Sequence, residues 1–288
     1  MATREPEALP RHHWPEYLIE AGALGTFMIS ACVFGTLVGH PASPLRHVLG
    51  TGWMARLVMG VLMGLTAIGI IYSPWGRRSG ALVNPALTLV FAGLGRIAPR
   101  DAGAYAAAQL AGGALGVMAA HALIGDALAH PRVRYVATAP GPRGIAVAFA
   151  AEVVISALLI TVVLNVSASD RWKRWTGVFA GLLVATFILL ESPLSGMSMN
   201  PARSWGSALA AGDWTAQWIY LAAPLLGMSL AAWIHVAMRR RPVPCPKFAH
   251  AEPCILCAYV RARAAREAPP VSSPHTIPFP STRTAERR

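Results

Sequence analysis

The tripeptide Asn-Pro-Ala occurs twice in this chain, at Asn84-Pro85-Ala86 and at Asn200-Pro201-Ala202. Asparagine is a favoured helix N-cap, and proline suits the first helical turn because its missing N–H would have no partner there. Each copy follows a loop that contains glycine and begins a short apolar stretch. The two copies therefore predict two short helices, one in each half of the chain, that meet inside a membrane.

The composition favours a membrane protein over a soluble one. Of the 288 residues, 55% are hydrophobic and only 13% are charged, whereas a soluble domain carries about 25% charged residues. The formal net charge of +12 would suit a nucleic-acid partner, but the sequence has no basic face with interleaved aromatic residues. We therefore expect lipid as the surroundings and no nucleic acid as a partner.

Six apolar segments have the length of about 20 residues that a membrane-spanning helix needs. These segments are residues 16–38, 53–73, 102–124, 144–166, 174–192 and 214–238. Two further apolar stretches, 84–93 and 200–210, are too short to cross, and they fit re-entrant half-helices that line a cavity. The predicted fold is an all-α membrane protein with six transmembrane helices and two half-helices.

The basic residues predict the orientation of the spans. With the N-terminus inside, 19 of the 25 lysines and arginines face the cytoplasm, as the positive-inside rule expects. Residues 1–15 then form a cytoplasmic N-terminal segment, 16–238 a channel domain and 239–288 a basic cytoplasmic tail. Both termini are expected on the cytoplasmic side of the cell membrane.

The two halves of the channel domain match each other. Glu20 lies in the first span of the first half, and Glu152 lies in the first span of the second half. Asn84 and Asn200 also occupy equivalent places in the two halves. Three spans per half make the second repeat (about 144–238) inverted relative to the first (about 16–124), which brings the two half-helices in from opposite faces.

The blocks Ser79-Gly80-Ala81-Leu82-Val83-Asn84-Pro85-Ala86 and Ser195-Gly196-Met197-Ser198-Met199-Asn200-Pro201-Ala202-Arg203 resemble those of the aquaporin, or major intrinsic protein, family. The resemblance covers residues 16–238 and indicates a divergent member. It implies six tilted helices and two half-helices around one pore, a homotetramer with four pores, no enzymatic activity and no cofactor required for the channel.

The resemblance also assigns roles to single residues. Asn84 and Asn200 would donate hydrogen bonds to water or small neutral solutes, and Arg203 would be a cation barrier at the narrowest point. Glu20 and Glu152 would be structural and accept hydrogen bonds from the backbone of the half-helix loops. Water and glycerol-like solutes would pass by passive flow, while protons and ions would be excluded.

The predicted selectivity filter departs from both main patterns of the family. Water-selective members have a histidine in the fifth span where this chain has Ile188. The span-two position falls on Met63 or Gly64, and Met197 and Arg203 complete the set. One cationic donor that faces three apolar groups predicts a wider and more apolar opening, which leaves open whether water or a larger neutral solute is preferred.

Two other functions fit the same pattern. A secondary transporter built on inverted repeats would need an ion-coupling site and would show saturable, gradient-coupled flux. A non-conducting membrane scaffold or sensor would be regulated through a tail rich in cysteine and histidine, and would show no permeability to any solute.

The tail carries a candidate structural zinc site. Three cysteines and one histidine within thirteen residues offer four ligands for tetrahedral zinc, at Cys245, His250, Cys254 and Cys257. The alternatives are reduced, unliganded thiols or juxtamembrane cysteines used for acylation.

If zinc folds this segment, chelating zinc from the purified protein will speed proteolysis of the tail, because binding free energy would then be folding free energy. Limited proteolysis with and without a chelator measures the effect. An unchanged cleavage rate after zinc is lost would count against a structural metal.

Overall fold

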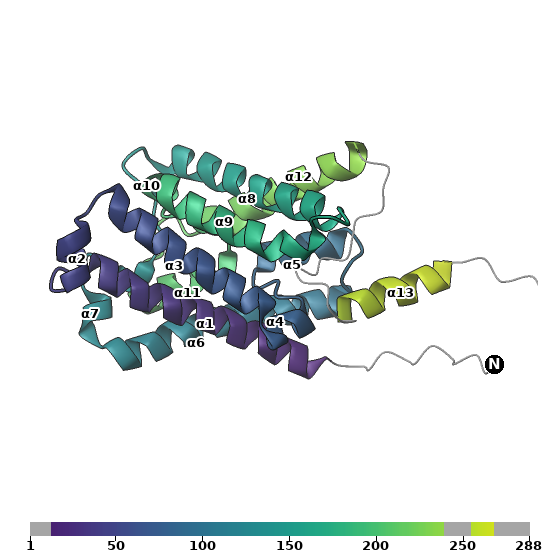
Figure 1. Cartoon of the computed structure of the whole chain (residues 1–288), viewed down its shortest axis with the longest axis horizontal. Coiled ribbons are helices and arrows are strands. Elements are labelled where there is room, and N and C mark those ends of the chain that lie inside the picture. The colour runs from purple at the N-terminus through teal and green to yellow at the C-terminus, as the bar shows by residue number, and fades with distance from the viewer. Residues whose placement is uncertain (1–12, 239–254, 268–288) are drawn as a thin grey trace, which may run out of the picture.

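The structure is a computed structural model that describes residues 13–238 and 255–267, and the regular elements of this described part are helices. Six of them are long and apolar enough to cross a membrane, if α9 is taken with the short helix η2 before it. They are α1 (Trp14–Gly39), α3 (Trp53–Tyr72), α6 (Pro99–Ile124), α8 (Ile145–Ser167), α9 (Thr176–Leu190) and α12 (Trp218–Met238), drawn in Figure 1. The six predicted spans are confirmed, with ends that differ by a few residues.

Both predicted half-helices are present, and each begins directly after its asparagine. They are α5 (Pro85–Gly93) and α11 (Pro201–Ala211), with Asn84 and Asn200 as their N-caps. The shorter helices are α2 (Pro44–Leu49), α4 (Pro74–Ser79), α7 (Asp126–Ala129), η1 (Arg134–Val136), η2 (Lys173–Trp175) and α10 (Ser192–Ser195). Proline in the first turn and a glycine with positive φ after the last turn mark the limits of α4, α10 and α11, as the sequence rules for helix ends predict.

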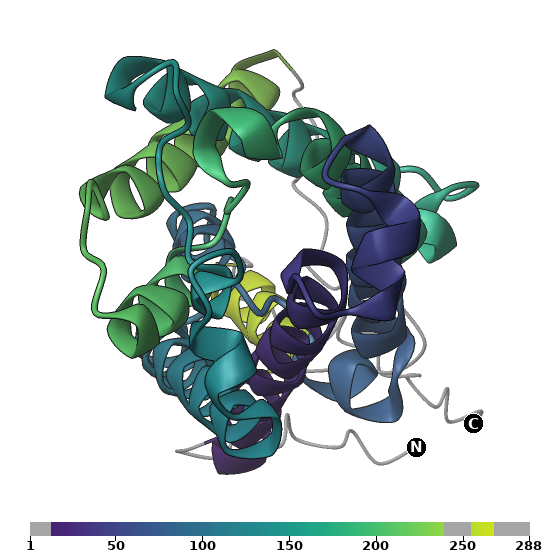
Figure 2. The same ribbon diagram turned by 90° about the vertical axis from the view of Figure 1, so that its left-hand side faces the viewer.

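The helices pack as two equivalent sets of three. α1 packs on α6 in the first repeat, α8 packs on α12 in the second, and α3 packs on α9 across the two repeats. Figure 2 looks along the bundle and shows the helices arranged as a ring. This arrangement places the two Asn-Pro-Ala segments at the centre of the molecule.

Glycine allows the closest of these helix contacts. A Cβ atom on Gly112 of α6 would collide with the backbone carbonyl of Ala21 on α1, and one on Gly64 of α3 would lie 2.6 Å from the carbonyl oxygen of Gly181 on α9. Small residues let helix backbones approach closely in membranes, where packing rather than hydrophobic burial drives association. Gly64 and Gly112 therefore act as contact points between neighbouring helices.

The outer surface of the bundle suits lipid. Large apolar side chains such as Leu18, Leu65, Leu115 and Leu190 are more than 60% exposed. Tryptophans stand near the ends of the spans, as in the aromatic belts of membrane proteins; they include Trp14, Trp53, Trp75, Trp172, Trp175, Trp214 and Trp218. Apolar surface of this kind is stable only when lipid or another apolar partner covers it.

The region predicted as a basic tail contains one described element, α13 (Ile255–Glu267). It lies at the same end of the bundle as the start of α1 and the helix α4 (Figure 1). Of the four predicted zinc ligands, Cys245, His250 and Cys254 lie outside the described residues, and Cys257 packs against the core next to the first turn of α13.

The crossing of α1 and α6 can be tested with two substitutions on one helix. We expect Gly112→Ala to destabilise the protein by about 1–3 kcal/mol, because the added methyl group overpacks a backbone contact. Gly103→Ala is the matched control, since nothing lies within 4 Å of a Cβ at that position. Thermal unfolding in detergent measures both, and equal midpoints for the two variants would contradict this account of the packing.

Candidate pore and selectivity filter

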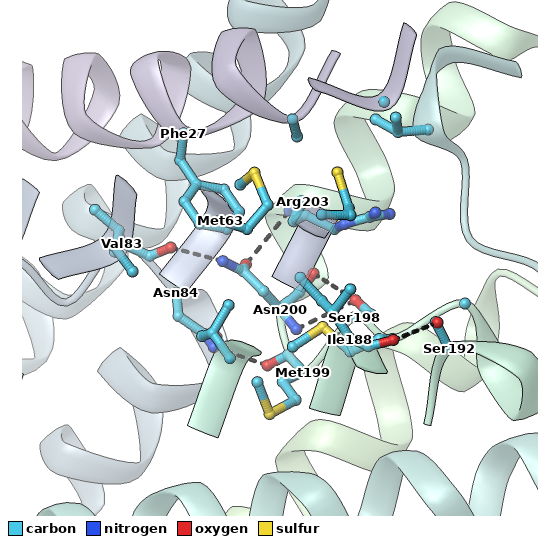
Figure 3. Close-up of a pocket in the computed structure, with 18 of the residues that line it drawn as sticks. Phe27, Met63, Val83, Asn84, Ile188, Ser192, Ser198, Met199, Asn200 and Arg203 are labelled. Carbon is cyan, nitrogen blue, oxygen red and sulfur yellow. Dashed lines mark hydrogen bonds between the residues drawn. The ribbon is translucent and has the colours of Figure 1, made fainter. Parts of the chain in front are cut away.

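The side chains of the two motif asparagines each join both half-helices. The Oδ1 atom of Asn84 accepts from the backbone N–H groups of Ala86 and Leu87, at 2.9 and 3.4 Å, and caps its own helix. Its Nδ2 donates to the carbonyl oxygen of Met199 at 2.7 Å, and Nδ2 of Asn200 donates to the carbonyl oxygen of Val83, also at 2.7 Å. The two loops are therefore tied to each other by a reciprocal pair of hydrogen bonds (Figure 3).

The first of these loops is fixed from behind by Glu20, as the family resemblance implied. The buried Glu20 carboxylate accepts from the Leu82 and Val83 backbone N–H groups at 3.1 and 2.7 Å, and from the Ser79 hydroxyl at 2.7 Å. Gln109 of α6 donates a fourth hydrogen bond at 2.8 Å. Because backbone at membrane depth has no water to bond with, these donors need such a partner.

Glu152 does the same for the second loop. Its carboxylate accepts from the backbone N–H groups of Ser198 and Met199, both at 2.8 Å, and from the hydroxyl of Ser195 at 2.6 Å. The hydroxyl of Tyr220 on α12 donates to the Ser195 carbonyl oxygen at 2.6 Å. Tyr105 of α6 donates to the Ser79 carbonyl oxygen of the first loop in the same way, at 2.9 Å. The serine, tyrosine and two backbone hydrogen bonds are thus the same in both loops, and the bond from Gln109 is an addition in the first.

Each loop also contains backbone in the left-handed region at matching positions. Three residues before each asparagine stand Ala81 (φ 52°) and Met197 (φ 53°), and one residue before it stand Val83 (φ 40°) and Met199 (φ 54°). A residue other than glycine in this region costs about 1–3 kcal/mol, and such residues cluster at functional sites. The buried carboxylates hold the loops in this conformation.

A cavity of about 360 Å³ runs beside the paired asparagines. Its described lining contains three arginines, Arg56, Arg132 and Arg203, and no aspartate or glutamate. Most of the remaining lining is apolar and includes Phe27, Met59, Met63, Val136, Val184, Ile188, Met197 and Met199. Figure 3 shows Met63, Ile188 and Arg203 gathered around Asn200. The site therefore combines a few fixed hydrogen-bond donors with a long apolar wall.

The predicted filter residues mostly lie on this cavity. Met63, Ile188, Met197 and Arg203 belong to its described lining, whereas Gly64 does not. Gly64 faces α9 and makes the close helix contact described above. Of the two residues that the sequence left open, Met63 is therefore the one that lines the cavity, and its part in a selectivity filter stays a prediction.

Arg203 stands at the start of α11, one residue after the motif. Its backbone N–H donates to Oδ1 of Asn200 at 3.3 Å, so the asparagine cap also fixes the arginine. Within the described part of the chain, Nη1 of Arg203 is buried and has no hydrogen-bond partner. A buried guanidinium donor without a partner costs free energy, and a passing solute is one group that can accept this hydrogen bond.

Several residues of the site escaped the sequence analysis. Arg56 lies in the first turn of α3 and lines the cavity, and its Nε donates to the Leu189 carbonyl oxygen at 3.0 Å. Phe27 of α1 also lines the cavity. Each lies in a long helix that is apolar on all sides, so no sequence pattern marks either residue as part of the cavity wall. Ser79 and Ser195 were detectable, because each stands five residues before a motif asparagine.

Comparison with known proteins agrees with this geometry. The family model described as "Major intrinsic protein" matches residues 13–235, which is well over half of the chain. The chain belongs to this family, as the paired motifs indicated. With its six apolar helices, it is an integral, multi-pass membrane protein.

Several named relatives are aquaporins of plants. Aquaporin NIP1-3 of Oryza sativa subsp. japonica is 38% identical over 180 residues, which cover 62% of this chain and 61% of that protein. Aquaporin NIP1-1 of Arabidopsis thaliana is 33% identical over 193 residues, covering 65% and 64%. The chain thus spans just under two thirds of the length of these two relatives.

A solved structure shares the fold. The aquaglyceroporin from Plasmodium falciparum superimposes with a TM-score of 0.61 and 19% identity, covering 77% of this chain and 95% of that one. This likeness confirms the aquaporin-like arrangement of six spanning helices and two half-helices.

The role of the buried carboxylates leads to a stability prediction. We expect Glu152→Ala to destabilise the protein by several kcal/mol, because it leaves three donors unpaired at about 1–3 kcal/mol each. Asp170→Ala is the control, since the side chain of Asp170 is 97% exposed and makes only a surface ion pair with Lys173, and such pairs contribute little to stability. Thermal unfolding in detergent would show the contrast, and a Glu152→Ala protein as stable as the control would contradict the structural role.

Proposed function

We propose that this protein is a passive channel for water and small neutral solutes such as glycerol, which excludes protons and ions. The observation that carries the proposal is the reciprocal bonding of Asn84 and Asn200 at the tips of two facing half-helices, beside a cavity with an apolar wall. The aquaporin and aquaglyceroporin names of the relatives and of the structural neighbour support it.

The paired asparagines supply donors at the middle of the pore. Each amide has two N–H bonds, and the inter-loop contact uses one of them, which leaves the other for the oxygen of a passing solute. Both half-helices also direct N-termini, each with a partial charge of about +0.5, at this place. A neutral hydroxyl compound can accept these hydrogen bonds without crossing an electrostatic barrier.

The charges of the lining disfavour cations. Three arginines and no acidic residue occur among the described lining residues, so a proton or cation would lose hydration and meet a repulsive field. This is the general basis of aquaporin-type selectivity. The same lining gives no sign of a carboxylate site for ion coupling, so it supports a channel better than a transporter.

The filter suits solutes larger than water. Ile188 stands where water-selective members have a hydrogen-bonding histidine, Met197 adds a second apolar group, and Met63 is flexible. Dewetting of such a wall limits water, while a solute with a carbon skeleton gains apolar contact. We therefore propose glycerol-like solutes alongside water as permeants.

Assembly and location follow the family pattern. We propose a homotetramer in the cell membrane, with both termini in the cytoplasm and no enzymatic activity. The exposed apolar sides of the helices support burial against lipid and sister subunits. Structural zinc in the tail stays a proposal, supported by the spacing of its three cysteines and one histidine.

The filter can be tested by swapping one residue. We expect Ile188→His to lower the ratio of glycerol permeability to water permeability about tenfold. The imidazole ring would bind water by hydrogen bonds and narrow the opening, and a tenfold change corresponds to about 1.4 kcal/mol between the barriers for the two solutes. Proteoliposome swelling and shrinkage in glycerol, urea and osmotic gradients measures the ratio.

Ile188→Leu is the matched control, since it keeps the position apolar. It should leave the glycerol-to-water ratio close to that of the wild type. An unchanged ratio in Ile188→His would remove Ile188 from the filter. The channel proposal itself fails if the wild type passes no solute faster than empty liposomes leak.

A further inference from the structure

Three arginines from three separate elements line the part of the pore cavity that lies towards one end of the bundle. Arg56 belongs to the first turn of α3, Arg132 to the loop between α7 and η1, and Arg203 to the first turn of α11. The helices α2 and α7, which precede Arg56 and Arg132 in the chain, stand at the end opposite the start of α1 (Figure 1). We call this part of the cavity, with its three arginines, the arginine chamber.

The chamber connects the surface of the protein to the predicted filter. Arg132 is exposed and lines the cavity, so the chamber opens to the surface there. Arg56 is half-buried and stands seven residues before Met63 on α3, which places it about 10 Å further from the filter along the same helix face. A solute that enters from this end therefore meets Arg132 and Arg56 before it reaches the filter.

The loop that carries Arg132 is held in place on both sides of the chamber. A Cβ atom on Gly39, at the end of α1, would lie 3.4 Å from the carbonyl oxygen of Arg132. The Thr138 hydroxyl lies 2.8 Å from the hydroxyl of Ser204, which follows Arg203 in α11. Between these contacts, residues 134–136 all have positive φ, between 47° and 52°. Left-handed backbone of this kind persists only where its surroundings enforce it, and it clusters at functional sites.

The guanidinium groups of the chamber keep donors to spare. Nε of Arg56 donates to the Leu189 carbonyl oxygen at 3.0 Å, which fixes the group and uses one of its five N–H donors. Nη1 of Arg203 has no hydrogen-bond partner among the described residues. In the same part of the chain, the ion pairs with aspartate or glutamate include none of the three arginines. The chamber thus holds three positive charges that no described carboxylate neutralises by direct contact.

Nearby carboxylates do not enter the chamber. Asp213, close to the loop that carries Arg132, is already paired with Arg134. Asp126 is exposed on α7, and neither aspartate belongs to the described lining of the cavity. A cleft lined by charges of one sign focuses the electrostatic field and concentrates ions of the opposite sign. The chamber therefore attracts anions from the solution at this end.

The chemistry of the donors suits an oxyanion. The planar fork of guanidinium N–H groups matches the oxygen atoms of phosphate and carboxylate. The cavity of about 360 Å³ is many times the volume of about 30 Å³ that one water molecule occupies in the liquid, so it has room for a small anion and several waters.

An anion that enters the chamber is not expected to pass through. Beyond the arginines the wall is apolar, with Met63, Ile188 and Met197, and a charged group pays a large desolvation cost in such surroundings. Conduction also requires that a bound ion can leave its site, whereas three positive charges hold it. A neutral solute meets neither obstacle.

We propose that the arginine chamber is a binding site for a small oxyanion of the class of inorganic phosphate, and that an anion held there obstructs the passage of neutral solutes. The anion accepts the hydrogen bonds that Arg203 otherwise offers to a passing solute. The binding part of this proposal stands by itself, and the obstruction rests on the proposed channel function.

The obstruction is tested by titrating proteoliposomes with inorganic phosphate on both sides of the membrane, at neutral pH and at constant ionic strength set with sodium chloride. Water permeability of the wild type should fall as phosphate rises. In Arg56→Met and Arg132→Met, each compared with its own permeability without phosphate, half-maximal loss should need about tenfold more phosphate, because one charged donor group is missing.

Arg46→Met is the matched control for the loss of one positive charge at the same end of the molecule. Arg46 lies on α2, donates to the Gly50 carbonyl oxygen at 3.2 Å and is not among the described lining residues. This variant should need the same phosphate concentration as the wild type.

A binding measurement does not depend on conduction. Phosphate that binds only the folded protein raises the midpoint of thermal unfolding in detergent, compared with chloride at equal ionic strength. The rise should be present in the wild type and Arg46→Met and smaller in Arg132→Met. Because Arg132 is exposed, its substitution leaves the packed core untouched, so this comparison holds even if Arg56→Met folds poorly.

The outcomes separate the site from the channel. The oxyanion site is overturned if phosphate leaves the midpoint of the wild type unchanged, or if Arg132→Met and Arg46→Met respond to phosphate alike in both measurements. Stabilisation of a conducting wild type without any loss of permeability overturns the obstruction. If phosphate stabilises the protein but the wild type conducts no better than empty liposomes, the channel function is overturned and the binding site stands.

Discussion

The structure depends on one reciprocal contact, in which each motif asparagine caps its own half-helix and donates to the backbone of the other loop. The distances from Nδ2 to the opposite carbonyl oxygen are equal at 2.7 Å. Two half-helices that enter from opposite faces would otherwise end in unpaired backbone at membrane depth, where each unsatisfied group costs several kcal/mol. The contact joins the two repeats and places two helix N-termini at one point of the pore.

The buried carboxylates make this contact possible. Glu20 and Glu152 replace the water that would otherwise bond to the loop N–H groups, and they keep left-handed backbone in place before each asparagine. A carboxylate is suited to this task because it accepts several hydrogen bonds at once and donates none. The rigid loops leave solute selection to the side chains on the cavity wall.

Much of the architecture could be predicted from the sequence because its signals are local or come in pairs. The Asn-Pro-Ala motifs, the six apolar segments and the two glutamates each have a direct physical meaning, and the structure contains all of them in the expected places. The choice between Met63 and Gly64 was not predictable, because the rotation of α3 about its axis depends on how it packs against α9. The cavity position of Arg56 depends on that same rotation.

The place of α13 was also beyond the reach of sequence reasoning. Its composition resembles a basic tail, and its burial is decided by two residues, Ile255 and Leu256, that pack at the end of the bundle where α1 begins. Short apolar pairs of this kind are common in loops, so only tertiary contact distinguishes a docked turn from an exposed one.

The central claim is that facing half-helices form a pore that passes neutral molecules and excludes protons. Simultaneous measurement of water and proton flux in the same proteoliposomes, with an entrapped pH-sensitive dye, tests it most directly. In vesicles that carry the wild-type chain, water flux should exceed that of empty vesicles while proton flux stays at the empty-vesicle level. Proton flux that rises together with water flux would contradict the account.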